Sequence, residues 1–231
     1  MTESSPPKFD QAITLTTPGG TEGVLFGLVW TIGMEPGVYP DGFEEQLGAL
    51  LVARQSDLTA EEDATRKAAR DILRFGRYKP TGRGKPASEY LIRAAREGSF
   101  PGISPAVDIC NYISLKHLVP ASVWDLDLAG QTCFARRGRE GESYVFNASG
   151  QEIGLQDLLV LADSSDRPMV NPVKDSHRTK THPASCNVAG IMYIPEAARL
   201  DAPAALEEFR ELMAGCGPVV ETGVRLCGGR A

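Results

Sequence analysis

Apolar residues follow two different spacings along the chain, helical over the first half and strand-like over most of the second. Residues 24–32 (VLFGLVWTI) form a compact apolar run between two glycines, which predicts a buried strand. Asp41 can cap a helix whose apolar face begins with Phe43. Three further helices are predicted, and the last of them begins at a Ser-Pro pair that suits a helix start. They cover residues 59–75, 88–97 and 104–116.

The second half of the chain has the pattern of short strands separated by turn residues. The predicted strands cover residues 123–128, 132–136, 143–146, 158–162, 188–194 and 219–226, and a last helix covers residues 202–214. Helices grouped first and strands afterwards predict an α+β fold with a mixed β-sheet in the C-terminal half. We expect one domain over residues 1–231, with a strand-helix-helix elaboration at residues 1–75 and a core at residues 76–231.

Charge changes this picture because it is unevenly distributed. The formal net charge is −6, yet residues 66–96 hold ten Lys or Arg against Asp71 and Glu89, so this stretch carries +8 and the remainder −14. One concentrated basic segment in an acidic chain suggests a localised anionic partner, although a merely solvated face is an equal alternative. On the second helix Arg66, Arg70 and Arg74 are spaced four residues apart, which predicts one exposed basic row. The cations predicted to bind that partner lie on this helix and in the Gly- and Pro-rich loop that follows it: Arg70, Arg74, Arg77, Lys79, Arg83 and Lys85.

Composition limits the class of protein. No run of about 18 apolar residues is present, so we expect no membrane association. Five cysteines without a CxxC pair suggest reduced thiols and a cytoplasmic location. The loop sequence Gly82-Arg83-Gly84-Lys85 lacks the frame of a P-loop, and no dinucleotide motif is evident, so we expect no cofactor.

The densest polar cluster covers residues 171–182 (NPVKDSHRTKTH), directly before an apolar strand. A loop at the end of a sheet is a natural place for binding or catalysis, and a solvated hairpin is the alternative. A metal site at His177, His182 and Cys186 matches no standard zinc spacing, and a triad of three consecutive residues rarely has the geometry to act. The preferred interpretation is recognition of a polar substrate, with Lys174 holding an anion and nearby hydroxyls holding a water.

Two positions on the fourth predicted helix are also candidates. Cys110 shares a helical stripe with apolar neighbours, so we expect it to face the core. Asp108 and Asn111 lie three residues apart on one face. They could line a pocket, or they could cap and bridge, and the sequence leaves both options open.

Several ordered segments carry a resemblance to a known family. Residues 99–130 contain Val107-Asp108, Asn111-Tyr112, Leu115, Pro120, Asp125 and Asp127, followed by the run 139–142 (REGE) and the strand-like 159–163 (LVLAD). In order and spacing these segments resemble the B3/B4 domain of the bacterial phenylalanyl-tRNA synthetase beta subunit, over roughly residues 85–200. The region around Lys79 and Lys85 looks more like free-standing relatives of that domain.

The resemblance implies an α+β fold and, in the synthetase, hydrolysis of tyrosine misattached to phenylalanine tRNA. Two positions depart from the pattern: Ser122 stands where the synthetase has a histidine, and Lys174 where it has a glutamate. Our first hypothesis is a module that hydrolyses misacylated aminoacyl-tRNA in trans and binds the tRNA acceptor end. The two alternatives are a tRNA- or amino-acid-binding domain that has lost hydrolysis, and a small-molecule-binding protein that reuses the pocket.

Under the first hypothesis each candidate residue has a role. Lys174 would stabilise the developing negative charge, and Asp175 or Ser176 would hold the attacking water. Substrate contacts are expected from five further positions: Asp108, Asn111, Ser122, Thr179 and Thr181. The sequence leaves the oligomeric state, the amino acid and the tRNA open.

Overall fold

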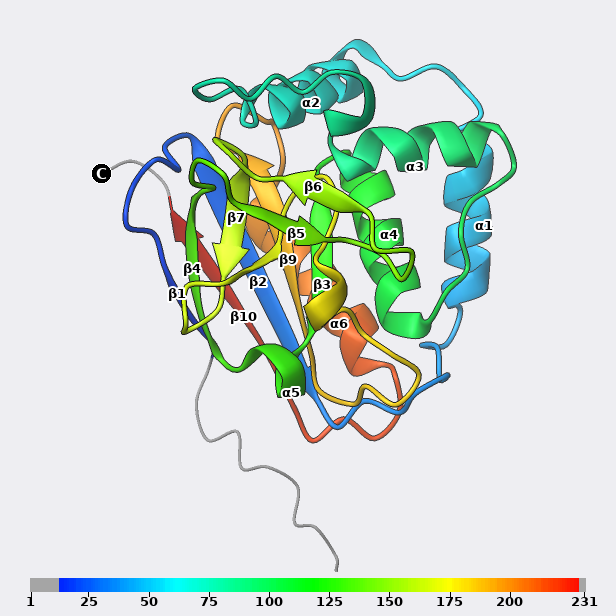
Figure 1. Ribbon diagram of the computed structural model, residues 1–231. Helices are drawn as coiled ribbons and strands as arrows, with labels where there is room; N and C mark the ends of the chain where they lie inside the picture. Colours follow the sequence, from blue (N-terminus) through cyan, green and yellow to red (C-terminus); the bar gives the residue numbers. More distant parts are fainter. Residues whose placement is uncertain (1–12, 229–231) are drawn as a thin grey trace, which may run out of the picture.

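Two β-sheets lie face to face in the computed structural model, which describes residues 13–228 (Figure 1). One sheet is antiparallel with strand order β10-β2-β9-β3, and the other is mixed with order β1-β4-β7-β8, because β1 pairs with β4 in parallel. A two-stranded ribbon, β5-β6, lies apart from both. The strands are β1 (Thr14–Thr16), β2 (Val24–Ile32), β3 (Ala121–Asp125), β4 (Thr132–Arg137), β5 (Ser143–Val145), β6 (Glu152–Gly154), β7 (Leu159–Ala162), β8 (Pro168–Val170), β9 (Val188–Pro195) and β10 (Glu221–Gly228).

The helices precede most of the strands, which confirms the predicted α+β fold with helices first. They are α1 (Phe43–Ala53), α2 (Ala60–Asp71), α3 (Ala87–Arg96), α4 (Pro105–His117), the short α5 (Leu126–Ala129) and α6 (Ala202–Ala214), with 3-10 turns η1 (Gly82–Gly84) and η2 (His177–Thr179). Helices α4 and α6 pack on one face of the antiparallel sheet, and the mixed sheet packs on the other. None of the helices within residues 13–228 is both long and apolar enough to cross a bilayer.

Strand β2 shows how the N-terminal segment becomes part of the antiparallel sheet. β2 is almost wholly buried and pairs with β9 on one side and β10 on the other. Its continuous apolar run suits a strand that is covered on both faces. The segment that we predicted as an elaboration, residues 1–75, therefore contributes an inner strand of the antiparallel sheet.

The predicted helices are confirmed, with corrections at their ends. The first begins at Phe43 with Gly42 in the left-handed conformation before it, so Asp41 is not its cap. The second begins at a capping box made by Thr59 and Glu62 but ends at Asp71, four residues earlier than predicted. The fourth begins after Ser104 with a proline in its first turn, as predicted.

The predicted strand over residues 123–128 is wrong in its second half. β3 ends at Asp125, whose carboxylate accepts the backbone N–H groups of Asp127 (2.8 Å) and Leu128 (3.1 Å) and so starts α5. These two hydrogen bonds stabilise the first turn of a helix, so the chain leaves the strand at Asp125 although the apolar pattern predicted a longer strand. Short strands β1, β6 and β8 were not predicted.

A close approach between α6 and β9 provides a test of the packing. A side chain at Gly190 would come within 2.6 Å of the Phe209 ring, whereas Gly154 has open space around it. We expect Gly190→Ala to lower the free energy of unfolding by about 2 kcal/mol, because helix and sheet must separate to admit the methyl group. Gly154→Ala is the matched control and should change it by less than about 0.5 kcal/mol. Urea unfolding measures both, and equal effects would contradict this packing.

Candidate functional site

The connection from β8 to β9, residues 171–187, carries the polar cluster and runs along the edge of β3. Asn171 organises its first turn, since its side-chain oxygen accepts the backbone N–H groups of Val173 (2.7 Å) and Lys174 (2.8 Å). Tyr144 donates its hydroxyl to the Lys174 carbonyl at 2.6 Å and accepts the side-chain amide of Asn171. Groups that satisfy one another in this way fix the turn, so the cluster is not a solvated hairpin.

Asp175 points from this segment toward β3. Ser122 donates its hydroxyl to the Asp175 carboxylate at 2.8 Å, and the backbone N–H of Asn171 donates to the same oxygen at 3.2 Å. Burial raises the pKa of Asp175 to about 7, from an ordinary value of 3.8, and the two donors only partly oppose that rise. A carboxyl group that gains and loses its proton near neutral pH has the property that general acid–base catalysis requires.

The surroundings of this carboxyl are mainly uncharged. Cys110 of α4 is buried, as predicted, and burial together with the charge of nearby Asp175 raises the pKa of its thiol. Tyr193 of β9 is buried as well, and its hydroxyl has no hydrogen-bond partner within residues 13–228. Among basic groups, Lys180 contributes a favourable charge at Asp175.

Lys174 faces the basic loop, a name we use for residues 77–86. Its ammonium group lies 4.0 Å from the centre of the Phe146 ring. Lys174 and Arg83 line one cavity of about 560 Å³ together with Tyr78. The N–H of Ala87 also donates to the carbonyl of Pro172 at 2.8 Å, so the end of the basic loop is bonded to the polar segment. The two regions therefore share one face of the molecule.

The remaining predicted residues of the segment lie in other surroundings. Ser176 begins η2, accepts the backbone N–H of Arg178 at 3.3 Å, and lines a separate cavity with Arg167. Thr179 is fully buried, and its hydroxyl has no partner in the described part of the chain. Lys174, Asp175 and Ser176 thus point to three different environments, and only Asp175 combines a shifted pKa with a bonded hydroxyl.

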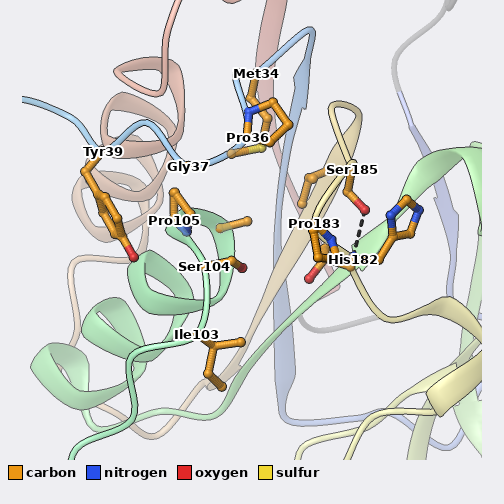
Figure 2. Close-up of a pocket in the computed structure, with 13 residues that line it drawn as sticks. Met34, Pro36, Gly37, Tyr39, Ile103, Ser104, Pro105, His182, Pro183 and Ser185 are labelled. Carbon is orange, nitrogen blue, oxygen red and sulfur yellow. Dashed lines mark hydrogen bonds between the residues drawn. The ribbon is translucent and has the colours of Figure 1, made fainter.

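Thr181 lines a further cavity of about 390 Å³ between the N-terminus of α4, the loop after β2 and residues 181–185 (Figure 2). Much of its wall is apolar, with hydroxyl groups at the rim. The apolar residues include Met34, Pro36, Ile103, Pro105, Pro183 and Val188, and the hydroxyls belong to Tyr39, Ser104, Thr181 and Ser185. A cavity of this character suits a small, largely apolar group with a few polar atoms.

One side of this cavity carries an arrangement that the sequence did not suggest. His182 Nε2 lies 3.4 Å from the buried carboxylate of Asp125, and His182 Nδ1 accepts the N–H of Ala184 at 3.2 Å. Ser185 donates its hydroxyl to the same carboxylate and accepts the backbone N–H of His182 at 2.9 Å. Since the serine hydroxyl bonds the carboxylate and not the imidazole, this is a loop anchor and not a nucleophilic triad.

Asp108 and Asn111 differ in how they are used. Both carboxylate oxygens of Asp108 are occupied, one by the Tyr39 hydroxyl (2.6 Å) and one by the backbone N–H of Ile103 (2.8 Å). Asp108 therefore shapes the cavity wall through Tyr39, and its role in substrate binding stays a prediction. Asn111 is half-buried, and no hydrogen bond joins its side chain to the rest of residues 13–228.

The predicted row of exposed arginines on α2 is largely neutralised. Arg70 donates to both oxygens of the Glu89 carboxylate on α3, and Arg66 lies 3.4 Å from the same group. Arg74 is exposed but pairs with Asp71 at 2.8 Å. The prediction of one exposed basic row is wrong for Arg66 and Arg70, because α3 brings a carboxylate against them.

The basic loop, in contrast, carries positive charge that is not paired in the part of the chain that the structure describes. Arg77, Lys79 and Arg83 are exposed and Lys85 is half-buried, and none of the four forms an ion pair within residues 13–228. A cavity of about 350 Å³ beside them is lined by Gly82, Arg83, Lys85, Glu89, Tyr90 and Arg93. Cations gathered around an aromatic ring are suited to a nucleic acid, which offers both phosphates and bases.

Comparison with known protein families decides the identity of this chain. The sequence profile of the B3/4 domain matches residues 79–200, more than half of the chain. The chain belongs to the B3/4 domain family. The match includes the loop residues Lys79, Arg83 and Lys85 and the whole polar segment, whereas Arg70, Arg74 and Arg77 precede it.

The B3/4 protein is similar to parts of two curated proteins. It is 29% identical over 137 residues to the phenylalanine--tRNA ligase beta subunit of Pseudomonas syringae pv. tomato, covering 53% of this chain and 17% of that one. It is 33% identical over 92 residues to the corresponding subunit of Novosphingobium aromaticivorans, covering 39% and 11%. The chain thus spans less than a fifth of the length of either relative.

A solved structure also aligns with this B3/4 protein. It is an N-terminal fragment of the phenylalanyl-tRNA synthetase beta subunit from Pyrococcus horikoshii, with a TM-score of 0.42 and 12% identity, and the alignment covers 96% of this chain and 53% of that one.

Sequence reasoning missed three parts of the B3/4 site. Tyr144 and Asn171 fix the turn that carries Asp175, and Asp125 anchors residues 181–185. Asn171 offered a local signal, because an asparagine before Pro-Val often forms a side-chain turn. Tyr144 and Asp125 offered none, since their partners lie 27 and 60 residues away along the chain.

Proposed function

We propose that this B3/4 protein hydrolyses the ester bond of misacylated aminoacyl-tRNA in trans. One observation carries the proposal: a carboxyl group with a pKa of about 7 lies in the segment that is bonded to a loop of unpaired cations. Phosphates of the tRNA acceptor end would bind the loop, and the ester would reach Asp175. The similarity to two phenylalanine--tRNA ligase beta subunits supports a tRNA-related role.

The chemistry that we propose is direct attack by water. The ionised Asp175 would take a proton from a water molecule while the oxygen of that water bonds to the ester carbonyl carbon. The bond to the ribose oxygen then breaks, and that oxygen takes up a proton, which releases the free amino acid and tRNA. Aminoacyl esters are already activated, so a positioned water and a base with a pKa near 7 suffice.

The supporting roles follow from the contacts of each residue. Ser122 would orient the Asp175 carboxyl, to which its hydroxyl is bonded. We assign Lys174 to a terminal phosphate, because its ammonium group lies in the cavity with Arg83. The aminoacyl side chain would enter the cavity beside Thr181. Asn111 lies seven residues along α4 from Ser104, which lines this cavity, so the two residues are about 10 Å apart along the helix.

Deacylation of a panel of mischarged tRNAs tests this function. We expect at least one ester to be cleaved much faster than in buffer, and binding to weaken steeply with salt because phosphates are bound. Wild-type protein that accelerates none of the esters would refute the proposal.

A second candidate is a tRNA-binding domain without hydrolysis. It is favoured by Ser122 and Lys174, which stand where the synthetase pattern has histidine and glutamate. A gel shift with tRNA but no turnover on the whole panel, unaltered by Lys174→Ala, would support this candidate.

Glu89 offers a gain-of-binding prediction. Its carboxylate pairs with Arg70, so Glu89→Gln should free that cation beside the basic loop, whereas Arg66 keeps its ion pair with Asp63 at 2.6 Å. We expect tRNA affinity to rise severalfold and the salt dependence to steepen by roughly one unit of log affinity per log salt. Glu207→Gln is the matched control, since Glu207 pairs with Arg210 at 2.5 Å on α6, outside the basic loop. Filter binding at several salt concentrations measures both, and unchanged affinity for Glu89→Gln would count against RNA binding on this face.

A further inference from the structure

β10 forms one end of the antiparallel sheet, and its outer edge pairs with no other strand in the described part of the chain. The strand is eight residues long and pairs along its whole length with β2 on its inner side. A long strand edge with free backbone groups is a template for pairing with another chain. Natural proteins usually protect such an edge, so an edge left open suggests a binding partner. The side chains of β10 then indicate what kind of partner it binds.

The side chains of β10 are unusually apolar for an exposed edge. Val224 is 38% exposed and Leu226 is 41% exposed, and Val220, just before the strand, is 82% exposed. These residues alternate along the chain, so they project from one face of the sheet. An apolar row at an open edge suits a partner that is also an apolar strand.

We propose that β10 pairs with β10 of a second copy of this chain, antiparallel and centred on Gly223. Glu221 and Arg225 are the charged residues of the strand, and an antiparallel pair centred on Gly223 sets each Glu221 opposite the Arg225 of the other copy. The same register sets Val220 opposite Leu226 and Thr222 opposite Val224. Both the charges and the apolar side chains are therefore self-complementary in a single register.

This association ends at two copies. Pairing uses the β10 edge of each chain and joins the two antiparallel sheets into one continuous sheet. The other end of the sheet, β3, is covered by the polar segment, since Ser122 bonds the Asn171 carbonyl and the Asp175 carboxylate there. With one edge used and the other covered, a closed dimer forms and a fibre does not.

Charge reversal tests both the association and its register. Wild-type protein is expected to show concentration-dependent dimerisation by sedimentation equilibrium. Glu221→Arg and Arg225→Glu each set like charges opposite one another twice, so each should raise the dimer dissociation constant about tenfold or more. An equimolar mixture of the two single variants should associate again, because the arginine introduced in one variant then meets the glutamate introduced in the other.

The mixture is the decisive arm, since it requires both variants to be folded and restores both opposite-charge pairs of the proposed register. Circular dichroism of each single variant separates loss of pairing from loss of fold, because Glu221 also accepts the indole N–H of Trp30 at 3.2 Å. The result that overturns the proposal is a monomer at every soluble concentration. Single variants that dimerise like wild type, or a mixture of folded variants that fails to associate, would equally overturn it.

Discussion

Asp175→Asn is expected to slow ester hydrolysis by about a hundredfold or more, the usual contribution of a general base. The substitution keeps an oxygen that can accept from Ser122 and from the Asn171 N–H, so the loop should keep its shape. Wild-type activity should rise with pH through the Asp175 pKa of about 7, because the base is active when ionised. The variant should lack that inflection. Single-turnover deacylation between pH 5 and 9 measures both effects.

Asp175→Asn should also change the free energy of unfolding, and the raised pKa of Asp175 determines the direction of that change. The pKa of Asp175 is higher in the folded state (about 7) than its ordinary value of 3.8, so the folded chain binds more protons between these values. The protonated Asp175 carboxyl therefore contributes its full amount to the free energy of unfolding below pH 4. This contribution is lost as the pH rises through the folded-state pKa of about 7. At pH 8 Asp175→Asn should therefore be more stable than wild type, by about 2 kcal/mol after allowance for partial exposure.

Asp163 is the matched control because its shift has the opposite sign. Burial acts to raise the pKa of Asp163, but N–H groups of Arg167 and Ser165 and the guanidinium of Arg178 hold it below its ordinary value. Asp163→Asn should consequently be less stable than wild type at neutral pH. Urea unfolding at pH 5 and pH 8 compares the two variants, and a loss of stability for Asp175→Asn at pH 8 would contradict the raised pKa.

Reversing two charges in the basic loop should produce the second large effect. Arg83→Glu with Lys85→Glu removes two cations that form no ion pair within residues 13–228 and adds two carboxylates beside the proposed phosphate path. We expect tRNA affinity to fall about a hundredfold, and the slope of log affinity against log salt to fall by roughly one to two units. The fold should be unaffected because neither side chain forms a hydrogen bond or an ion pair within residues 13–228.

The control is a double reversal with the same change in net charge at a distant site. Arg199→Glu with Arg210→Glu alters the region around α6, outside the basic loop. If tRNA binding depends only on net charge, the two double variants will weaken it equally. A selective loss for the loop variant, measured by filter binding, locates the RNA contact.

Features encoded by neighbouring residues could be predicted from the sequence. Ser104-Pro105 predicted the start of α4, and the apolar run at residues 24–32 predicted β2, because capping and strand burial depend on local pattern. Asp125 shows the limit: it belongs to a strand-like run but caps a helix, and the capping bonds decide the outcome.

The properties that define the candidate site depend on contacts between distant residues. Asp175 owes its pKa to burial beside Ser122, which lies 53 residues earlier in the chain. Glu89 cancels charges on α2 that the sequence counted as a basic row. Composition gives the number of charges, but only the packing of α3 on α2 determines which remain unpaired.

The central claim is that one tRNA end reaches the basic loop and Asp175 together. Single-turnover hydrolysis of a mischarged tRNA, compared with that of a short aminoacyl ester of the terminal nucleoside, tests this claim most directly. We predict that the tRNA saturates the protein at a far lower concentration, that the Arg83 and Lys85 reversals abolish this advantage, and that Asp175→Asn slows both substrates. Equal half-saturation for the two substrates, or no hydrolysis of either above the rate in buffer, would contradict the account.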